Sequence, residues 1–380
     1  MLRKRIAIIG SRGIPARYGG FETFAEELST RLVARGVDVT VYCEGAGGPT
    51  MHKGVHLAYV PTPHLGGLTT ILHDFRALWH ARKRFDIVYM LGYGTSIFCL
   101  LPKLHRTPIW MNMDGVEWKR EKWGFFGKSW WKTMEFVAQY IPDLMIADAE
   151  AIRNFLSDRH RHMPECAVIP YGANVINTPP DVSALNDWRV LPRQYHLIVS
   201  RLEPENHVLE LFEGYIASQS PYPLVALGTT RKPNRYTRAL QDLARENERI
   251  ILPGPVYDDR IQALRYYART YLHGHSVGGT NPSLLEAMGS GSPVIAHENV
   301  FNREVAQDTA VYFKNSDDVA NLIRILDKDE GLRRSLGQRA KERVLETYSW
   351  ERVTSMYLRL LEVGVEEPLE KKEEAVAVTP

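Results

Sequence analysis

Residues 275–296, HSVGGTNPSLLEAMGSGSPVIA, combine several glycines, an Asn-Pro pair and one acid directly before an apolar run. Asn281 is a good N-cap residue, and Pro282 is favoured at the first position of a helix, so a helix is expected to begin here. The amides of the first turn, at Ser283 and Leu284, would lie at the positive end of the helix dipole. This arrangement predicts a binding site for an anion such as phosphate.

The residues around this turn extend the predicted site. Gly278 and Gly279 lack a Cβ, so the backbone before the helix can approach a ligand closely. Glu286 lies one turn into the helix, where its carboxylate can accept hydrogen bonds from a ribose diol. Together these features are typical of a site for a nucleoside diphosphate. The alternative is a tightly packed loop-to-helix connection that binds no ligand.

A second glycine-rich loop lies near the N-terminus. The segment GSRGIPARYGGFETF, residues 10–24, joins a short apolar run to a helical pattern and places Gly19 and Gly20 at the start of that helix. Loops at the carboxyl ends of parallel strands bind ligands in doubly wound sheets. The segment does not match GxGxxG, which disfavours a dinucleotide-dependent dehydrogenase.

An aspartate and two histidines could serve as a catalytic group or as metal ligands. Asp114 follows the predicted strand TPIWMNM, where it could orient or deprotonate an acceptor hydroxyl; a turn-forming Asp-Gly is an equal alternative. His273 and His275 flank Gly274 at a strand end, but neither a third ligand nor a DxD motif accompanies them. We therefore expect a metal-independent protein without a cofactor.

An aromatic and basic segment, residues 118–136, suggests a further role. Rings interleaved with cations suit the interface of an anionic bilayer, and a lipid-linked acceptor would arrive there. The alternative is that the rings pack inward and the lysines are solvated. The residues concerned are Trp118, Trp123, Trp130, Trp131, Lys119, Arg120, Lys122, Lys128 and Lys132.

The composition limits the classes of protein to consider. With 380 residues, two domains are expected, and a formal net charge of +2 disfavours nucleic acid as a partner. Three scattered cysteines, Cys43, Cys99 and Cys166, indicate reduced thiols in a cytoplasmic protein. The longest apolar stretch, residues 87–102, is interrupted by glycine, threonine and serine, so we expect no membrane span.

Short apolar runs alternate with helical patterns along the chain, which is the βαβ rhythm of α/β proteins with parallel sheets. The series lapses near residue 180, in the Pro-rich and Asn-rich stretch NTPPDVSALNDWRVLPRQ, and then resumes. We predict two Rossmann-like domains facing each other across a cleft. Their bounds are 1–185 for acceptor binding and 190–348 for nucleotide-sugar binding, with helix 349–365 packing back on the first domain and a disordered tail at 366–380.

Four motifs now carry a resemblance: the Gly19-Gly20 pair, VIPYGAN (168–174), SRLEPEN (200–206) and LLEAMGSGSPVIA (284–296). In this order they resemble the retaining GT-B glycosyltransferases of family four, over roughly residues 3 to 360. The opening GSRGIPARYGGFETF and the segment HGHSVGGTNPSLLEAM are similar to a narrower subgroup. These are bacterial rhamnosyltransferases that build cell-wall and capsular polysaccharides on a lipid carrier.

The resemblance implies roles for individual residues, with two departures. Glu286 matches the second glutamate of the family's E-x7-E pair, but the first position holds Gly278. Arg201 matches the arginine of RLxxEK, whereas the lysine position holds Asn206, which the resemblance still implies lies at the donor. Arg201 and the backbone amides near Asn281 would then carry the diphosphate.

The same resemblance suggests supporting roles for Thr280 and His275 at the diphosphate, and for Glu304 as a late acidic residue near the donor sugar. It implies a retaining transfer, with L-rhamnose from dTDP-rhamnose as the favoured donor and a lipid-diphosphate-linked glycan as acceptor. The protein would act at the inner leaflet of the cytoplasmic membrane as a peripheral protein. The alternatives are a nucleotide-sugar epimerase of similar fold and a non-catalytic scaffold in polysaccharide assembly.

Overall fold

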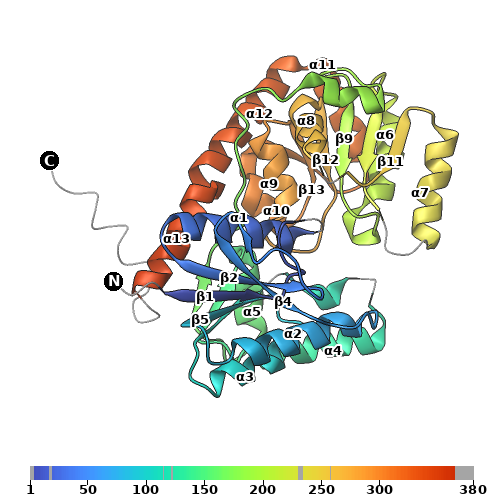
Figure 1. Cartoon of the computed structure of the whole chain (residues 1–380). Helices are drawn as coiled ribbons and strands as arrows, with labels where there is room; N and C mark the ends of the chain where they lie inside the picture. The colour runs from blue at the N-terminus through green and yellow to red at the C-terminus, as the bar shows by residue number, and fades with distance from the viewer. Residues whose placement is uncertain are drawn as a thin grey trace. The chain divides into compact units, whose positions relative to one another are not determined.

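The computed structural model describes residues 4–16, 19–113, 115–120, 123–229, 234–256 and 258–363. The chain forms two compact α/β units, each with a central sheet (Figure 1). The N-terminal unit contains the residues up to 118, residues 123–170, and the chain from 351 onward. The C-terminal unit contains residues 119–122 and 171–350.

The N-terminal unit has an eight-stranded sheet with the order β3-β4-β2-β1-β5-β6-β7-β8. All neighbours are parallel except β3 and β4. The order reverses between β1 and β5, so the loops after these two strands lie at the point where ligands bind in doubly wound sheets. The strands are β1 (Arg5–Ile9), β2 (Asp38–Glu44), β3 (Met51–His52), β4 (Val55–Val60), β5 (Ile87–Leu91), β6 (Ile109–Met113), β7 (Leu144–Ala147) and β8 (Cys166–Val168).

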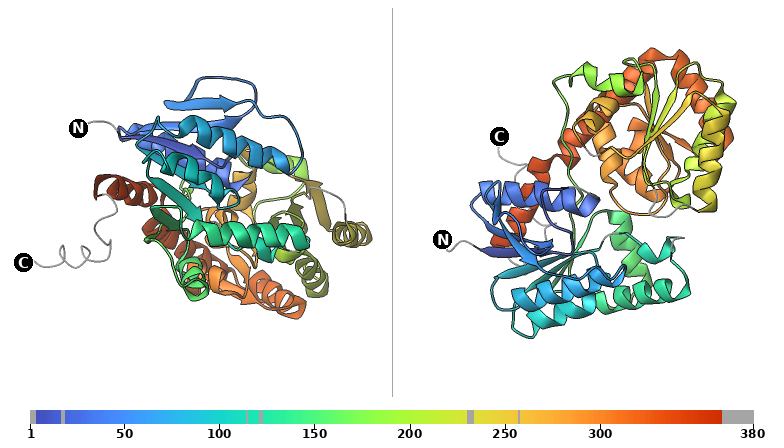
Figure 2. Two further views of the ribbon diagram at one scale, coloured as in Figure 1. Left: turned by 90° about the horizontal axis from the view of Figure 1, so that it is seen from below. Right: turned by 45° about the vertical axis from the view of Figure 1, so that its right-hand side comes forward.

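Helices cover both faces of this sheet. In Figures 1 and 2, α2 and α4 run side by side on one face, and α1 and α13 lie on the other. Helix α13 comes from the far end of the chain, and its Tyr357 hydroxyl forms a buried 2.7 Å hydrogen bond with Tyr89 of β5. The helices are α1 (Gly20–Ala34), α2 (Leu68–Ala81), α3 (Leu100–Lys103), α4 (Phe125–Ala138), α5 (Glu150–Arg159) and α13 (Trp350–Val363), with the 3₁₀ turns η1 (Ser96–Cys99) and η2 (Glu117–Lys119).

The C-terminal unit has a six-stranded, fully parallel sheet with the order β11-β10-β9-β12-β13-β14. This sheet reverses its order between β9 and β12, as the first sheet does between β1 and β5. The strands are β9 (His196–Val199), β10 (Leu224–Leu227), β11 (Ile250–Gly254), β12 (Thr270–His273), β13 (Val294–His297) and β14 (Ala310–Phe313).

The helices of this unit alternate with the strands in sequence, except for α11 and α12, which follow β14. They are α6 (Val208–Ser218), α7 (Arg235–Glu246), α8 (Arg260–Tyr267), α9 (Pro282–Gly289), α10 (Val300–Ala306), α11 (Ser316–Lys328) and α12 (Glu330–Arg343). The short helical turns are η3 (Val182–Trp188), η4 (Pro204–Asn206), η5 (Gln307–Thr309) and η6 (Val344–Tyr348). The stretch in which the alternation lapses belongs to this unit, and its turn η3 buries Leu185 and Trp188.

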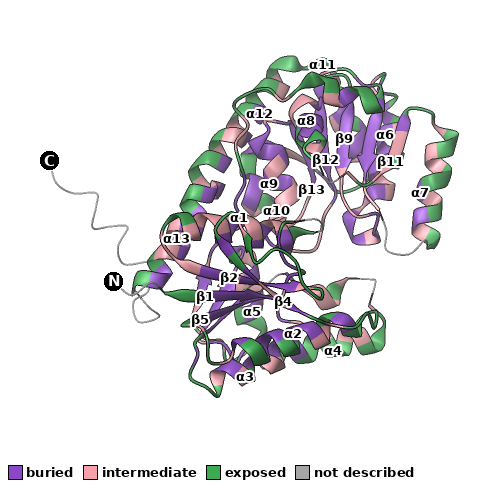
Figure 3. Ribbon diagram, viewed as in Figure 1, coloured by how far each residue is buried: buried purple, intermediate pink, exposed green. Residues whose placement is uncertain are grey.

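Burial follows the layers (Figure 3). The strands at the centre of each sheet are buried on both faces, whereas the helices bury one side only. The expected alternation of strands and helices is present, and strands such as β5, β7 and β10 are short apolar runs in which every residue is buried. The predicted tail, 366–380, lies outside the described residues. Among the residues that the structure does describe, no helix is long and apolar enough to span a bilayer.

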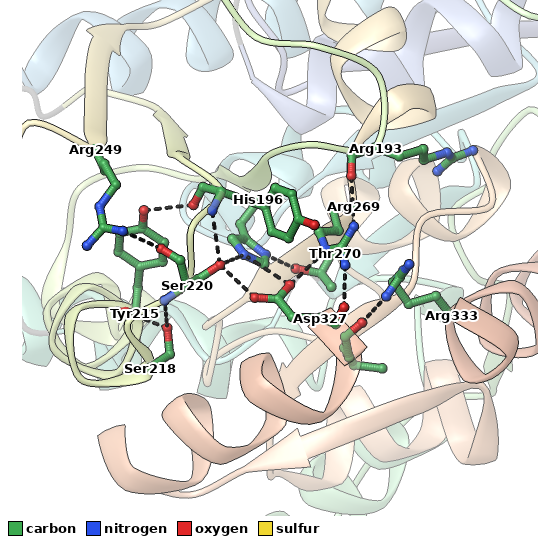
Figure 4. A network of polar contacts seen from close by, with 12 residues as sticks. Arg193, His196, Tyr215, Ser218, Ser220, Arg249, Arg269, Thr270, Asp327 and Arg333 are labelled. Carbon is green, nitrogen blue, oxygen red and sulfur yellow. Dashed lines mark hydrogen bonds and ion pairs between the residues drawn. The ribbon is translucent and has the colours of Figure 1, made fainter. Parts of the chain in front are cut away.

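A polar network joins the amino ends of the two central strands of the C-terminal sheet (Figure 4). His196 at the start of β9 contacts the Thr270 hydroxyl at the start of β12 at 2.6 Å, and its Nε2 lies 3.0 Å from the Ser220 hydroxyl. Ser220 donates to Asp327, which also accepts from Arg269 at 2.7 Å. Because the Ser220 hydrogen is directed to Asp327, Nε2 of His196 donates to Ser220 and its Nδ1 accepts from Thr270. The network fixes the two strands at the edge opposite their carboxyl ends.

Candidate functional site

The predicted binding residues of the C-terminal unit lie in two loops, residues 200–207 after β9 and residues 274–281 after β12. These strands are hydrogen-bonded neighbours, and the strand order reverses between them. Both loops therefore leave the carboxyl edge of the sheet at its switch point, where doubly wound folds bind their ligands.

The two loops hold one another in place. A Cβ at Gly274 would lie 2.0 Å from the Asn206 carbonyl oxygen, so only glycine permits this approach. The Nδ1 of His207 donates to the Gly274 carbonyl at 2.9 Å. The amide and hydroxyl of Ser276 both donate to the Glu205 carbonyl, at 3.0 and 2.9 Å. The loops thus form one rigid surface at the carboxyl edge.

Arg201 places a solvent-exposed guanidinium group on this surface. Its side chain is 37% exposed, and its nearest carboxylate, that of Glu203, lies 3.7 Å away, which is too far for a hydrogen bond. Asn206, predicted to contact the donor, is instead 2% exposed and donates its side-chain amide to the Arg201 carbonyl at 2.7 Å. It positions the backbone of Arg201.

A second guanidinium lies beside the same loop. Arg120 belongs to residues 119–122, which group with the C-terminal unit, and its Nη1 lies 3.7 Å from a carboxylate oxygen of Glu205. Both Glu203 and Glu205 are buried, and neither Glu205 oxygen has a hydrogen-bond partner among the described residues. Burial, and then the negative charge of Glu203, raise the pKa of Glu205 above its ordinary value. Two arginines, Arg201 in the loop and Arg120 beside it, therefore lie near the two buried acids Glu203 and Glu205.

The start of α9 differs from the prediction. The Asn281 side chain accepts from the Ser283 amide at 3.0 Å, and the Asn281 carbonyl accepts from the Leu284 amide at 3.1 Å. The Ser283 hydroxyl is also engaged, with the Val199 carbonyl at 3.0 Å and the Tyr271 hydroxyl at 2.6 Å. The prediction that the amides of Ser283 and Leu284 are free for an anion is wrong, because the N-cap itself satisfies them.

The backbone conformation at position 278 favours glycine. Its φ of 129° lies in a region that L side chains rarely adopt, so a glutamate here would strain the loop. Thr280 is buried beside it, with 2% of its surface exposed, and Gly279 is buried as well. The loop thus makes a turn at residue 278 that glycine adopts without strain.

His273 at the end of β12 is buried, and its ring stacks on that of the half-buried His275 in the second loop. The rings of His273 and His275 lie 4.5 Å apart at 14°. Burial, followed by the charge of His297, lowers the pKa of His273 to about 3. Burial also lowers the pKa of His275 well below its ordinary value, and His273, Arg201 and Arg120 add to this effect. Both rings are therefore neutral at neutral pH and offer hydrogen bonds rather than charge. In the part of the chain that the structure describes, no group of three or more His, Cys, Asp or Glu side chains could hold a metal ion.

Two asparagines that the sequence analysis missed support this loop. Asn299 and Asn302, at the start of α10, donate their side-chain amides to the His275 carbonyl at 3.0 and 2.9 Å. Asn302 also bonds the His297 carbonyl at 2.8 Å, so it joins the ends of β12 and β13. The run HENVFN contains the only signal, an Asn before a helical pattern, which predicts an N-cap but not a long-range contact.

The remaining predicted residues of this unit have defined surroundings. The carboxylate of Glu286 lies 2.6 Å from Nη2 of the buried Arg265, with its own side chain 35% exposed, so it is oriented but still accessible. Glu304 lies on α10, where its carbonyl accepts from Arg343 at 2.8 Å. Asp114 lies outside the described residues.

The glycine-rich loop of the N-terminal unit packs closely against its own sheet. A Cβ at Gly10 would lie 2.3 Å from the Leu91 carbonyl oxygen, and one at Gly13 would lie 2.5 Å from the Cys43 sulfur. Gly19 is the N-cap of α1, with a φ of 90°, and Gly20 is its first residue. Gly10 and Gly13 allow the loop to approach Leu91 and Cys43 closely, so these two glycines serve packing rather than a ligand.

The side-chain carboxyl group of Glu22 lies near the start of α1. A carboxylate oxygen of Glu22, in the first turn, accepts from the Arg12 amide at 3.0 Å, and the other lies against Gly19. Burial raises the pKa of Glu22 above its ordinary value. A phosphate at Gly19 and Gly20 would therefore meet a carboxyl group that already occupies this turn.

Most of the predicted membrane-facing tryptophans pack inward. The indole N–H of Trp118 donates to Glu135 at 2.7 Å, and that of Trp123 donates to Glu117 at 3.2 Å. The Trp131 ring packs edge-on against Tyr93, with ring centroids 5.3 Å apart. For these three rings the inward-packing alternative describes the structure.

The exposed part of the segment is different from the predicted one. Trp130 is 39% exposed while it donates to the Gly94 carbonyl at 2.9 Å. Lys132 is exposed and lies over the Trp118 ring, and Lys128 is half-buried. The most exposed aromatics are Phe125 and Phe126, which the sequence analysis passed over because their spacing does not show which way α4 faces.

Two domain families match the sequence. Residues 3–174 match a domain of unknown function, DUF1972, and residues 190–343 match the family described as "Glycosyl transferases group 1". No curated protein matches the chain. The second match covers the loops after β9 and β12, so the prediction of a glycosyltransferase is confirmed at the level of this domain.

Solved structures match nearly the whole chain at low identity. Sucrose-phosphate synthase from Thermosynechococcus elongatus has a TM-score of 0.78 at 18% identity, covering 95% of this chain and 99% of that one. Anabaena HepE in complex with UDP-glucose has a TM-score of 0.77 at 16% identity, covering 95% and 100%. The UDP-forming α,α-trehalose-phosphate synthase from Burkholderia xenovorans has 0.69 at 13% identity, covering 94% and 100%. The chain therefore has the GT-B fold, as predicted.

Proposed function

We propose that this chain, which carries a glycosyl transferases group 1 domain in a GT-B fold, is a retaining glycosyltransferase. It would transfer L-rhamnose from dTDP-rhamnose to a lipid-diphosphate-linked glycan at the inner face of the cytoplasmic membrane. The observation that carries the proposal is the exposed Arg201 on two interlocked loops at the switch point of the C-terminal sheet. Solved neighbours of the same fold are described with UDP, UDP-glucose or as UDP-forming, which supports a nucleotide-sugar donor.

The arginines suit a leaving diphosphate. Arg201 offers a planar pair of donors for bidentate contact with phosphate oxygens. The position where the resembled family has a lysine holds Asn206, whose amide is used inside the loop. Arg120 would supply the second cation instead, because it lies beside Glu205 in that loop and, like Arg201, lowers the pKa of His275. We propose that the diphosphate binds between these two guanidinium groups.

One neutral group and one acid would complete the donor site. The neutral His275 ring can hydrogen-bond a phosphate or sugar oxygen without adding charge. Glu286, held by Arg265, can accept from the ribose hydroxyls with its remaining lone pairs. Charge neutralisation would then come from arginines alone, so we propose that transfer needs no metal ion.

The donor is tested by thermal shift of the purified full-length protein with EDTA present. The nucleotides dTDP, UDP and GDP and their sugars are compared, because a ligand that binds only the folded chain raises the melting temperature by mass action. A larger shift with dTDP and dTDP-rhamnose supports the proposed donor. A larger shift with UDP or GDP compounds keeps the transferase and contradicts rhamnose.

Turnover distinguishes the enzyme from a scaffold, which the glycine at 278 and the asparagine at 206 would also suit. Release of dTDP from dTDP-rhamnose is measured with a lipid-linked saccharide acceptor, and the anomeric configuration of the product is read by NMR. Retained configuration supports the proposal. Binding of the donor without release in the presence of acceptors would point to the scaffold.

A further inference from the structure

Helix α2 exposes its larger apolar side chains to solvent. Leu68, Leu72, Phe75 and Trp79 have the spacing i, i+4, i+7 and i+11, so they form one stripe along the helix. Leu68 is 60%, Phe75 38% and Trp79 51% exposed. The opposite, buried side carries the smaller Ala77 and Ala81 together with Leu78 and the polar His73 and Asp74. A stripe of this kind at the surface marks an interaction site.

Helix α4 exposes a second apolar group. Phe125 is 82%, Phe126 86% and Phe136 54% exposed, and the first two rings contact each other edge-on. Phe125 and Phe136 are eleven residues apart, which is close to three full turns, so both lie on one side of the helix.

The two helices present these residues on the same face of the sheet, where they run side by side (Figures 1 and 2). The 3₁₀ turn η1 connects them. Phe75 of α2 packs edge-on against Phe98 of η1, with ring centroids 5.3 Å apart. Ser96 of η1 donates to the Met134 carbonyl of α4 at 2.8 Å. We call the six exposed residues Leu68, Phe75, Trp79, Phe125, Phe126 and Phe136 the α2–α4 surface.

The ionic side chains that α2 and α4 themselves expose have one sign. Each helix contains one acid, Asp74 in α2 and Glu135 in α4, and both are buried. Thr95 donates to Asp74 at 2.8 Å, and Arg159 donates to Glu135 at 2.8 Å. The ionic side chains that α2 and α4 expose, Arg76 and Lys132, are therefore cationic, and Lys83 and Arg84 follow the end of α2.

We propose that the α2–α4 surface docks the N-terminal unit onto an anionic lipid bilayer. Exposed phenylalanine, leucine and tryptophan side chains enter the region between headgroups and acyl chains, while arginine and lysine side chains contact the anionic headgroups. A protein partner would need acidic complementarity to the same cations and would bury apolar rings in a packed interface. The absence of exposed acids on both helices, together with aromatic rings that project far into solvent, favours the bilayer.

This inference deepens the proposed function, since a lipid-linked acceptor would be reached from the docked state, and it rests on that function only in this respect. It also replaces the predicted contact through Trp118, Trp123 and Trp131. Those rings are half-buried and engaged in hydrogen bonds or ring contacts of the N-terminal unit, whereas the α2–α4 surface is more exposed to solvent.

The test is sedimentation of the full-length protein with vesicles. Wild-type protein is compared on phosphatidylcholine vesicles and on vesicles that also contain phosphatidylglycerol. We expect binding that depends on phosphatidylglycerol. The double variants Phe125→Ser/Phe126→Ser and Phe75→Ser/Trp79→Ser should each lower the partition coefficient by about tenfold or more, because they remove the apolar part of the contact.

Matched controls come from the other unit. Ile325 is 51% and Leu345 62% exposed, so Ile325→Ser/Leu345→Ser removes two exposed apolar side chains of similar accessibility without touching the α2–α4 surface. This control should bind vesicles as the wild type does. The charge reversal Arg76→Glu/Lys132→Glu should abolish the preference for phosphatidylglycerol while the circular dichroism spectrum stays unchanged.

Three outcomes would overturn the proposal. The first is that the wild type does not bind vesicles that contain phosphatidylglycerol. The second is that both aromatic double variants bind as tightly as the control. The third is that analytical ultracentrifugation shows a dimer that the aromatic substitutions dissociate. The last result would assign the surface to a second copy of the chain. The donor panel is run on the same variants. Vesicle binding without any nucleotide shift would contradict the proposed function alone, and a nucleotide shift without vesicle binding would contradict this inference alone.

Discussion

At the scale of single residues, the site depends on which polar groups are already engaged within the chain. The Ser283 amide and hydroxyl, and the Asn206 amide, all have partners inside the loops. Arg201 keeps its guanidinium open. The residues best able to meet a ligand are therefore fewer than the motifs alone indicate, and they are mainly cationic.

Arg201→Ala is expected to lower the rate of transfer by about 100-fold or more, because it removes a bidentate donor at the developing charge of the leaving diphosphate. Arg201→Lys should recover only part of the rate, since an ammonium group keeps the charge but not the paired geometry. Initial rates at saturating donor measure both effects. An alanine variant that turns over like the wild type, with an unchanged melting temperature, would remove Arg201 from the site.

Arg120→Ala is expected to weaken donor binding through the loss of the second cation. Calorimetric titration with the nucleoside diphosphate should show an affinity reduced about tenfold, in the range of one charge-assisted hydrogen bond. Arg245→Ala on α7, whose side chain is 74% exposed, is the matched control and should bind normally. Equal affinities for the two variants would exclude Arg120 from diphosphate binding.

At the scale of elements, strand order decides where the site forms and helix starts decide how firmly it is held. The loops after β9 and β12 meet because these strands are neighbours in the sheet, although about 70 residues separate them in sequence. The start of α10 then fixes the second loop through Asn299 and Asn302. These contacts make α10 a support for the second loop.

Asn302→Ala is expected to loosen the loop, because the His275 and His297 carbonyls lose a shared buried donor. The loss should lower the free energy of unfolding by about 1–2 kcal/mol and raise KM for the donor more than it lowers kcat. Urea unfolding and steady-state kinetics measure the two effects. A variant with lower stability and wild-type KM would show that Asn302 is structural only.

At the scale of the whole molecule, the sequence predicted the order of strands and helices well, since each buried strand is a short apolar run. It did not predict β3 or β8, which have only two and three residues, or β4, in which polar residues interrupt the apolar run. It also did not show that η3, which is polar in sequence, buries Trp188. Contacts such as that between Arg120 and Glu205 join residues 85 positions apart, so no local spacing reveals them. The direction in which α4 faces also depends on packing, which is why Phe125 and Phe126 were missed.

The buried histidines predict how stability depends on pH. Burial lowers the pKa of His196 to about 4 and that of His273 to about 3, from an ordinary value of 6.5. At a pH between each lowered pKa and 6.5, the histidine is protonated in the unfolded chain but not in the folded chain. The stability of the C-terminal unit therefore falls as the pH falls below about 6.5. Each such histidine contributes a slope of about 1.4 kcal/mol per pH unit.

Urea unfolding between pH 6.5 and pH 5 measures this slope, above the range in which most carboxylates titrate. His273→Phe should reduce it by about one proton, and His56→Gln, at an exposed histidine of the N-terminal unit, should leave it unchanged. A slope that His273→Phe does not alter would mean that this ring titrates normally in the folded chain.

The hydrogen bond between Tyr89 and Tyr357 joins β5 to the last described helix. Tyr357→Phe removes one hydroxyl from this buried pair and should lower the free energy of unfolding of the N-terminal unit by about 1–2 kcal/mol. The transition of the C-terminal unit should not move, because both tyrosines belong to the other unit. Hydrogen exchange followed by mass spectrometry resolves the two units and would contradict the prediction if both lost protection equally.

Helix α13 also has a consequence for how the chain is made. The ribosome releases residues in order, so the first 170 residues emerge long before the helix at residues 350–363 that packs on their sheet. The C-terminal unit is complete once residue 350 has left the exit tunnel, whereas the unit synthesised first must wait for the final helix. In the nascent N-terminal unit, the surface on which Tyr357 packs therefore stays exposed until the end of translation. Chaperones that bind apolar segments can bind this surface during that time.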